Sequence, residues 1–247
     1  MPTLVCLAHR PGAAVRLYCV PPGGAGPEFY QPWAGLLPET IEPYTFALPG
    51  RGTRRDEPSV TDLHALAAAL ASLTDNAADS RPFALFGHSL GALLTYETAR
   101  RLRRTARREP ALVALSALPA PHQRDFERLL ATLVTSGLDR VTDLVGPLPA
   151  ELLEDPLTVT RVCTPHLADL VLALHHRHHD EPPLQASLAL YGGDADPLVP
   201  PGCLEGWNDL FATPTTPHLF AGCHTYPLDQ ASALVHQLNK DLQTAIR

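Results

Sequence analysis

The sequence is poor in cysteine and lacks the spacings that make cysteine structurally useful. Its 247 residues include five cysteines, an odd number, and no C-x-x-C pair occurs. We therefore expect neither a disulfide framework nor a structural zinc site. Such cysteine usage is typical of proteins from reducing compartments, and it favours a cytoplasmic location.

The chain also lacks long apolar runs and an excess of positive charge. No stretch reaches the roughly 18 apolar residues that span a bilayer, and the start, MPTLVCLAHRPG, does not resemble a secretory signal. The formal net charge is −7, so neither nucleic acid nor membrane is an expected partner. One basic run, residues 100–108, follows a helix-like segment and suits a solvated helix end; a partner-binding patch is the alternative.

Hydrophobic segments with strand-like and helix-like patterns alternate along the chain. Hydrophobic residues make up 45% of it, enough for one sizeable core. The pattern predicts strands at residues 15–20, 44–48, 83–86, 111–118, 188–191 and, weakly, 216–220. It predicts helices at residues 63–73, 93–102 and 228–243. We infer one α/β domain over residues 1–247, with a mostly parallel central sheet and helices on both faces.

Residues 119–182 interrupt this alternation. The segment is helical in character, is broken by proline and glycine, and has no strong strand pattern. It is too long for a plain connection between neighbouring strands. We interpret it as an inserted helical lid over the active-site edge of the sheet.

A serine lies between two glycines where a strand gives way to a helix, in the sequence FGHSLGA at residues 86–92. Strand, G-x-S-x-G and helix together form a nucleophile elbow. The turn is so tight that Gly87 and Gly91 must lack side chains, and it lifts the Ser89 hydroxyl off the sheet edge. The backbone N–H of Leu90 is then placed to stabilise an oxyanion.

A serine nucleophile needs a histidine base and a carboxylate that orients the histidine, here expected in the order Ser, acid, His. Two aspartates follow the strand at 188–191, and we favour Asp196 because a proline and an apolar pair would turn it inward. Asp194 is the alternative, with a turn-capping role otherwise. For the base we favour His224, in a small-residue loop, over His218, which would lie in a strand.

The second oxyanion donor is expected in the loop after the first of these strands. Gly23 is the favoured donor and Gly24 the next candidate, although glycines there also suit a plain turn. His88 is interpreted as a packing and hydrogen-bonding residue. Cys223 lacks an elbow of its own, and the histidine tract at residues 175–179 suits a helix end better than a metal site.

These motifs resemble the type II thioesterases that accompany modular polyketide synthases and nonribosomal peptide synthetases. The resemblance runs over almost the whole chain. It rests on VPPGG (20–24), FY and PW (29–33), LPGR with EP (48–58), the FGHSLGA elbow, GGDADP (192–197) and GCH (222–224). The LPGR and FY/PW elements are far more diagnostic than G-x-S-x-G alone.

The resemblance implies an α/β-hydrolase with a helical lid that cleaves acyl thioesters from phosphopantetheine arms of carrier proteins, in editing or product release. The family's triad matches Ser89, Asp196 and His224, and its oxyanion donors match Leu90 and Gly23. The implied partner is an acyl or peptidyl carrier protein or domain. No metal or other cofactor is implied, and a monomer is expected.

The chain departs from the family pattern at four places. PGGA (22–25) stands where His-Ala-Gly-Gly is usual, Leu90 replaces a methionine, PHLAD (165–169) lacks the usual arginine, and SALPA (116–120) lacks a Ser-Gly-Arg pattern. These changes concern substrate choice and carrier docking rather than the triad. An oxygen-ester carboxylesterase, a product-releasing cyclase and a non-catalytic carrier-docking protein stay open as alternatives.

Overall fold

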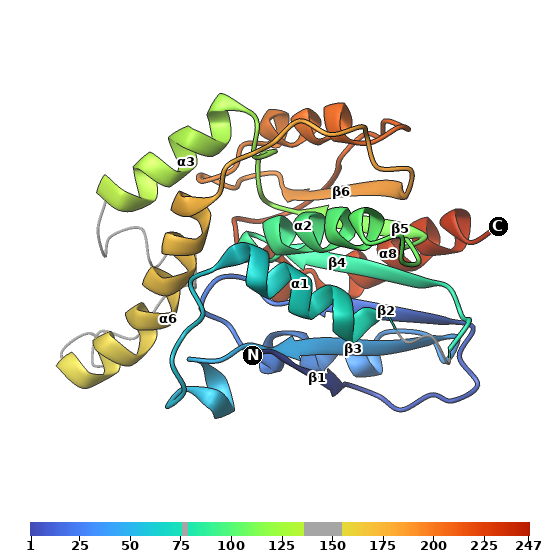
Figure 1. The fold of residues 1–247 in the computed structure, drawn as a ribbon, viewed down its shortest axis with the longest axis horizontal. Helices are drawn as coiled ribbons and strands as arrows, with labels where there is room; N and C mark the ends of the chain where they lie inside the picture. Colours follow the sequence, from blue (N-terminus) through green and yellow to red (C-terminus); the bar gives the residue numbers. More distant parts are fainter. Residues whose placement is uncertain (76–78, 136–154) are drawn as a thin grey trace.

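The computed structural model describes residues 1–75, 79–135 and 155–247. Within these ranges the strands are β1 (Thr3–Cys6), β2 (Val15–Val20), β3 (Ile41–Ala47), β4 (Phe83–His88), β5 (Leu112–Ser116), β6 (Ser187–Gly193) and β7 (His218–Phe220). They form one sheet in the order β1-β3-β2-β4-β5-β6-β7 (Figure 1). Only β1 runs antiparallel to its neighbour in this described sheet. The predicted α/β fold with a mostly parallel sheet is confirmed.

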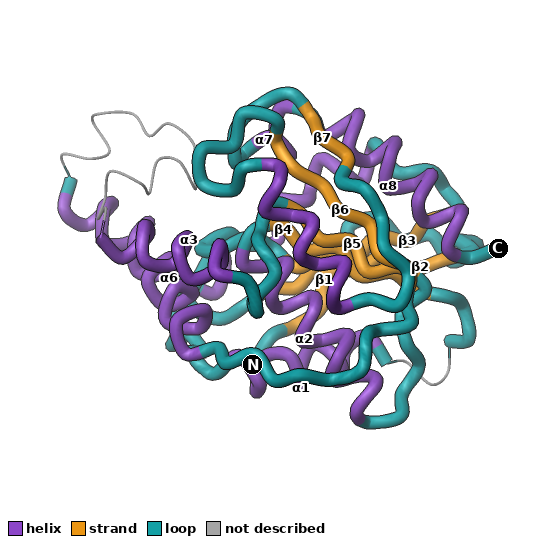
Figure 2. The backbone as a smooth tube through the Cα atoms, turned by 90° about the horizontal axis from the view of Figure 1, so that it is seen from above, coloured by secondary structure: helices purple, strands orange, loops and turns teal. Residues whose placement is uncertain are grey.

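Helices cover both faces of the sheet. Figure 2 shows α1 (Leu63–Thr74) and α2 (Leu90–Arg104) on one side and α8 (Ala231–Ala245) on the other. The alternation of side chains along β4 separates two cores: Leu85 joins the cluster under α1 and α2, whereas Phe86 joins the cluster under α8. This two-sided burial is why the central strands read as continuous apolar runs.

Several elements differ from the expected ones, three of them by more than a shifted strand end. β1 was not predicted, because it has four residues at the sheet edge and is only partly buried. The predicted helix at 228–243 is two helices, α7 (Tyr226–Asp229) and α8, which are separated by Gln230. The helix expected from residue 93 begins at Leu90, because the elbow leads into it directly.

The segment predicted as a lid is described only in part. Helices α3 (Arg124–Thr135) and α6 (Pro156–His175) lie beyond one end of the strands in both views (Figures 1 and 2). Residues 136–154 lie outside the described ranges, so the single-domain and lid boundaries stay predictions. Three 3-10 helices complete the described elements: η1 (Pro27–Gly35), η2 (Gly52–Arg54) and η4 (Pro201–Leu210). Among the described helices, none has the length and apolar character required to span a membrane.

The basic run at residues 100–108 is mostly exposed at the end of α2, as expected, but part of it is engaged within the molecule. Arg100 is 1% exposed, which makes the expected solvated helix end wrong for this residue. Arg100, Arg103 and Arg104 all pair with the carboxylate of Glu181, which follows α6. Burial raises the pKa of Glu181, but hydrogen bonds from the three arginines outweigh it and lower the pKa to about 2.

This cluster predicts a pH-dependent contribution to stability. Because the folded-state pKa of Glu181 is depressed, its contribution is complete above the unfolded value near 4.5 and is lost as the pH falls toward 2. Glu181→Gln should lower the free energy of unfolding by about 2 kcal/mol at pH 7. The deficit should shrink to less than half at pH 3 in urea unfolding curves.

The exposed Glu205 offers the matched control for this measurement. Glu205→Gln should unfold like the wild type at both pH values. A deficit for Glu181→Gln that is the same at pH 7 and pH 3 would contradict the linkage to its ionisation.

Candidate active site

Ser89 lies at a strained turn between β4 and α2. Its backbone has φ 55° and ψ −129°, a conformation that side-chain-bearing residues rarely adopt. A Cβ at Gly87 would lie 2.1 Å from the Gly91 carbonyl oxygen, and one at Gly91 would lie 2.4 Å from the Val20 carbonyl oxygen. The turn therefore needs both glycines, as the sequence predicted. The Ser89 N–H donates to the Ser116 carbonyl at 2.8 Å, which ties the elbow to β5.

The structure brings Ser89, His224 and Asp196 into one hydrogen-bonded line. His224 Nε2 lies 2.9 Å from Ser89 Oγ, and His224 Nδ1 lies 2.8 Å from Asp196 Oδ2. The His224 and Asp196 side chains are almost completely buried. The other Asp196 oxygen accepts the N–H groups of Leu198 at 2.9 Å and Val199 at 3.1 Å. These bonds fix the carboxylate, and a carboxylate so fixed sets the orientation and tautomer of the imidazole.

The two competing candidates lie elsewhere. Asp194 Oδ1 accepts the N–H of Gly222 at 3.0 Å, so its side chain closes the turn that precedes His224. His218 lies in β7, stacks on Tyr191 with ring centroids 5.9 Å apart, and lies 3.7 Å from Asp241. Neither side chain contacts Ser89, so the preference for Asp196 and His224 agrees with the geometry.

A second line of hydrogen bonds lies beside His224 and includes His88, whose ring centroid is 5.2 Å from that of His224. His88 Nδ1 lies 2.8 Å from Ser116 Oγ, which lies 2.6 Å from the Tyr226 hydroxyl. Burial, and then the proximity of His224, lower the pKa of His88, although a hydrogen bond with the His224 backbone opposes this. His88 is therefore neutral at physiological pH and acts in packing and hydrogen bonding, as interpreted from the sequence.

Leu90 and Gly23, the expected oxyanion donors, both lie beside Ser89 on the wall of a cavity of about 410 Å³. Leu90 is the first residue of α2, where backbone N–H groups have no acceptor within the helix. Gly23 belongs to the loop after β2. An N–H from each side of the serine is the arrangement that stabilises a tetrahedral oxyanion.

The cavity is mainly apolar. Its apolar lining comes from Leu90, the loop after β5, and helices α3 and α6: Leu118, Phe126, Leu129, Leu130, Leu133, Val134, Leu167, Leu170 and Ala173. Its polar lining includes Ser89 and His224 together with His166 and Asp169 of α6. Such a cavity suits an aliphatic group attached to a reacting carbonyl.

Sequence reasoning missed two residues near the site. Asp169 lines the cavity and forms an ion pair with Arg51, and both side chains are 2% exposed. The signals were present, because Arg51 ends the LPGR motif and Asp169 ends PHLAD. What the sequence could not give was the pairing between residues 118 positions apart.

The other reactive residues are engaged elsewhere. In the histidine tract, His176 is buried against the Glu97 carboxylate at 3.2 Å, and His178 stacks on Tyr96. The tract thus packs on α2 as well as ending α6. Cys223 is exposed, and its sulfur lies 3.4 Å from the Thr225 hydroxyl.

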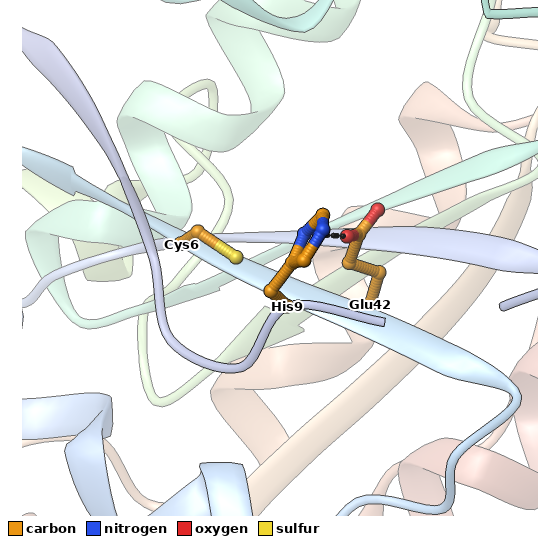
Figure 3. A group of neighbouring side chains, drawn as sticks. All are labelled: Cys6, His9 and Glu42. Atoms are coloured by element: carbon orange, nitrogen blue, oxygen red, sulfur yellow. Dashed lines mark ion pairs between the residues drawn. The ribbon is translucent and has the colours of Figure 1, made fainter. Parts of the chain in front are cut away.

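Among the described residues, one group has the ligand types and proximity for a metal: Cys6, His9 and Glu42 (Figure 3). Its carboxylate is already engaged, because Glu42 accepts the Arg10 N–H at 3.0 Å and the Arg81 guanidinium at 2.8 Å. Burial and the charge of Glu42 raise the pKa of the Cys6 thiol, which keeps it protonated. A cation would have to compete with Arg81 and the thiol proton, so we assign no metal there.

Comparison with known proteins agrees with this geometry. The family model described as "Thioesterase domain" matches residues 15–242. AMB antimetabolite synthetase AmbE of Pseudomonas aeruginosa is 34% identical over 81% of the chain, which spans only 10% of that large protein. Thioesterase PikA5 of Streptomyces venezuelae is 27% identical over 94% of the chain and 82% of its own length.

The solved structures show the same relationship. The type II thioesterase BorB from the borrelidin biosynthetic cluster superposes with a TM-score of 0.78, at 30% identity over 97% of both chains. The resemblance inferred from the sequence motifs is thereby confirmed. The chain belongs to the thioesterase family, and the solved structures that it resembles include type II thioesterases such as BorB and YbtT, the latter from an NRPS/PKS biosynthetic pathway.

Proposed function

We propose that this protein hydrolyses acyl thioesters carried on the phosphopantetheine arm of a carrier protein, in editing or product release. The observation that carries the proposal is the Ser89–His224–Asp196 line, which opens into an apolar cavity. The cavity accepts the acyl chain, and the names of the structural neighbours YbtT and ClbQ, both from NRPS/PKS pathways, favour a polyketide or nonribosomal peptide system. The partner is an acyl or peptidyl carrier protein, and the enzyme acts as a monomer.

In the first step, Ser89 Oγ attacks the thioester carbonyl carbon while His224 Nε2 takes the hydroxyl proton. The N–H groups of Leu90 and Gly23 stabilise the oxyanion. As the carbon–sulfur bond breaks, His224 returns the proton to the departing sulfur and leaves an acyl-serine. Asp196 holds the imidazole in the reactive tautomer and stabilises its charged form.

In the second step, water attacks the acyl-serine, and His224 accepts a proton from that water. The tetrahedral intermediate collapses, the proton passes to Ser89 Oγ, and the carboxylic acid is released. The two steps consume the thioester and one water molecule, release a thiol and a carboxylic acid, and restore Ser89 and His224. The proposal therefore includes no metal or cofactor besides the phosphopantetheine that belongs to the substrate.

The function is tested with a carrier protein loaded with acetyl, butyryl or octanoyl groups, compared with the matching ethyl esters. We expect kcat/KM for at least one loaded carrier to exceed that for its ethyl ester by more than tenfold. Similar or better turnover of the free esters would identify an oxygen-ester carboxylesterase. A cyclised product from a chain that bears a terminal hydroxyl would identify a cyclase.

Ser89→Ala should reduce kcat by at least about 10⁴-fold, because it removes the nucleophile. In intact-mass measurements the wild type should gain one acyl or fluorophosphonate group, and the variant none. Ser72→Ala, on the exposed face of α1, is the matched control and should behave like the wild type. A wild type that never forms the adduct would leave only a carrier-docking protein.

Asn substitutions of the two aspartates in the loop after β6 should have very different effects on kcat. Asp196→Asn should lower kcat by about 10⁴-fold, because an amide in that place favours the unreactive tautomer of His224. Asp194→Asn is the matched control and should change kcat less than about threefold, since its oxygen still accepts the Gly222 N–H. Steady-state kinetics on the same loaded carrier measures both, and the reverse order of effects would contradict the assignment.

A further inference from the structure

The loop that carries Gly23 is held from outside by helix α6. The N–H of Gly24 donates to Asp169 Oδ2 at 2.8 Å. Gly24 has φ +74°, and a Cβ there would lie 2.1 Å from the ring of His166, one turn before Asp169 on the same helix. The backbone of the loop therefore rests against α6 at two points, next to Gly23, the expected second oxyanion donor.

Asp169 is itself held in place by Arg51. The guanidinium approaches both carboxylate oxygens, at 2.7 Å for Nη2 and Oδ1 and at shorter distance for Nη1 and Oδ2. Both side chains are 2% exposed. A forked, buried pair fixes the direction of the carboxylate, and it leaves one Asp169 oxygen shared between Arg51 and Gly24.

The second contact of the loop with α6 is the His166 ring, which lies against Gly24 and is uncharged. Its Nδ1 donates to the Val162 carbonyl one turn earlier, at 2.7 Å. Burial lowers the pKa of His166 more than the neighbouring Asp169 raises it. The imidazole is therefore uncharged beside Gly24, and Asp169 alone supplies the charge that holds the N–H.

We propose that Asp169 is a positioning residue for the oxyanion hole: through the Gly24 N–H it sets the Gly23 N–H toward the reacting carbonyl, and Arg51 holds Asp169 in place. This inference rests on the proposed thioesterase function. If Asp169 has this role, the stabilisation of the oxyanion by the Gly23 N–H depends on the packing of α6 against the loop. When α6 is displaced, the Gly24 N–H loses its carboxylate acceptor, and the oxyanion loses one well-placed donor.

The test replaces the pair without leaving a buried charge. In the double variant Arg51→Met/Asp169→Leu, side chains of similar size fill the site, and such replacements often preserve stability. The Gly24 N–H then has no acceptor on α6. The matched control is Arg16→Met/Asp79→Leu, which removes an ion pair with side chains 4% and 19% exposed near the start of β2, away from the cavity and from α6. Thermal unfolding first establishes that both proteins are folded.

On octanoyl carrier protein we expect kcat of the Arg51→Met/Asp169→Leu variant to fall about 10- to 100-fold, with KM within threefold of the wild type. Inhibition by an alkyl trifluoromethyl ketone, which forms a tetrahedral adduct with the serine, should weaken by a similar factor. The control variant should keep kcat and inhibition within about threefold. Asp169→Asn, which keeps an oxygen acceptor, should lose less activity than the double variant.

Two results would overturn the inference. A folded double variant with wild-type kcat and inhibitor affinity would show that the pair has only a structural role. A rise in KM with unchanged kcat would make Asp169 a substrate-binding residue instead. Both results require a wild type that forms the acyl-serine. Without that adduct the proposed function fails, and the two failures stay distinguishable.

Discussion

The site depends on the close approach between the start of α2 and the end of β2. Gly91 has no room for a side chain, because a Cβ would lie 2.4 Å from the Val20 carbonyl oxygen and 2.6 Å from that of Pro21. The same approach fixes the strained Ser89 turn and places the loop after β2 next to the serine. Strain of this kind costs on the order of 1–3 kcal/mol, and the surrounding β-sheet core holds it in place.

Burial then determines how the charged groups act. His224 and Asp196 lie under the wall of an apolar cavity, where a hydrogen bond between them is stronger than it would be in water. Asp196 avoids the cost of an isolated buried charge because it accepts two backbone N–H groups besides the imidazole. His88, which lacks such acidic support, is neutral. The same physical rule thus gives two neighbouring histidines different roles.

Local patterns allowed much of the fold and site to be predicted. The elbow, the paired aspartates and the Gly-Cys-His loop are short motifs whose geometry follows from a few adjacent residues. The order in which these motifs occur along the chain then allowed Ser89, Asp196 and His224 to be predicted as one triad. Contacts between distant residues that leave no local pattern were not accessible. The Arg51–Asp169 pair, the His176–Glu97 contact and the pairing of the short β1 with β3 all belong to this class.

The loop after β2 departs from the family pattern with PGGA at residues 22–25, and its contacts with α6 suggest a physical consequence of this difference. Pro21 and Pro22 limit the backbone before Gly23, whereas the glycines at 23 and 24 leave the rest of the loop free to adopt many conformations in isolation. A donor on so permissive a loop can be well placed only if something outside the loop restricts it. Asp169 and His166 of α6 supply that restriction. The helix that lines the substrate cavity would then also order the catalytic loop, so that substrate enclosure and oxyanion stabilisation depend on the same packing.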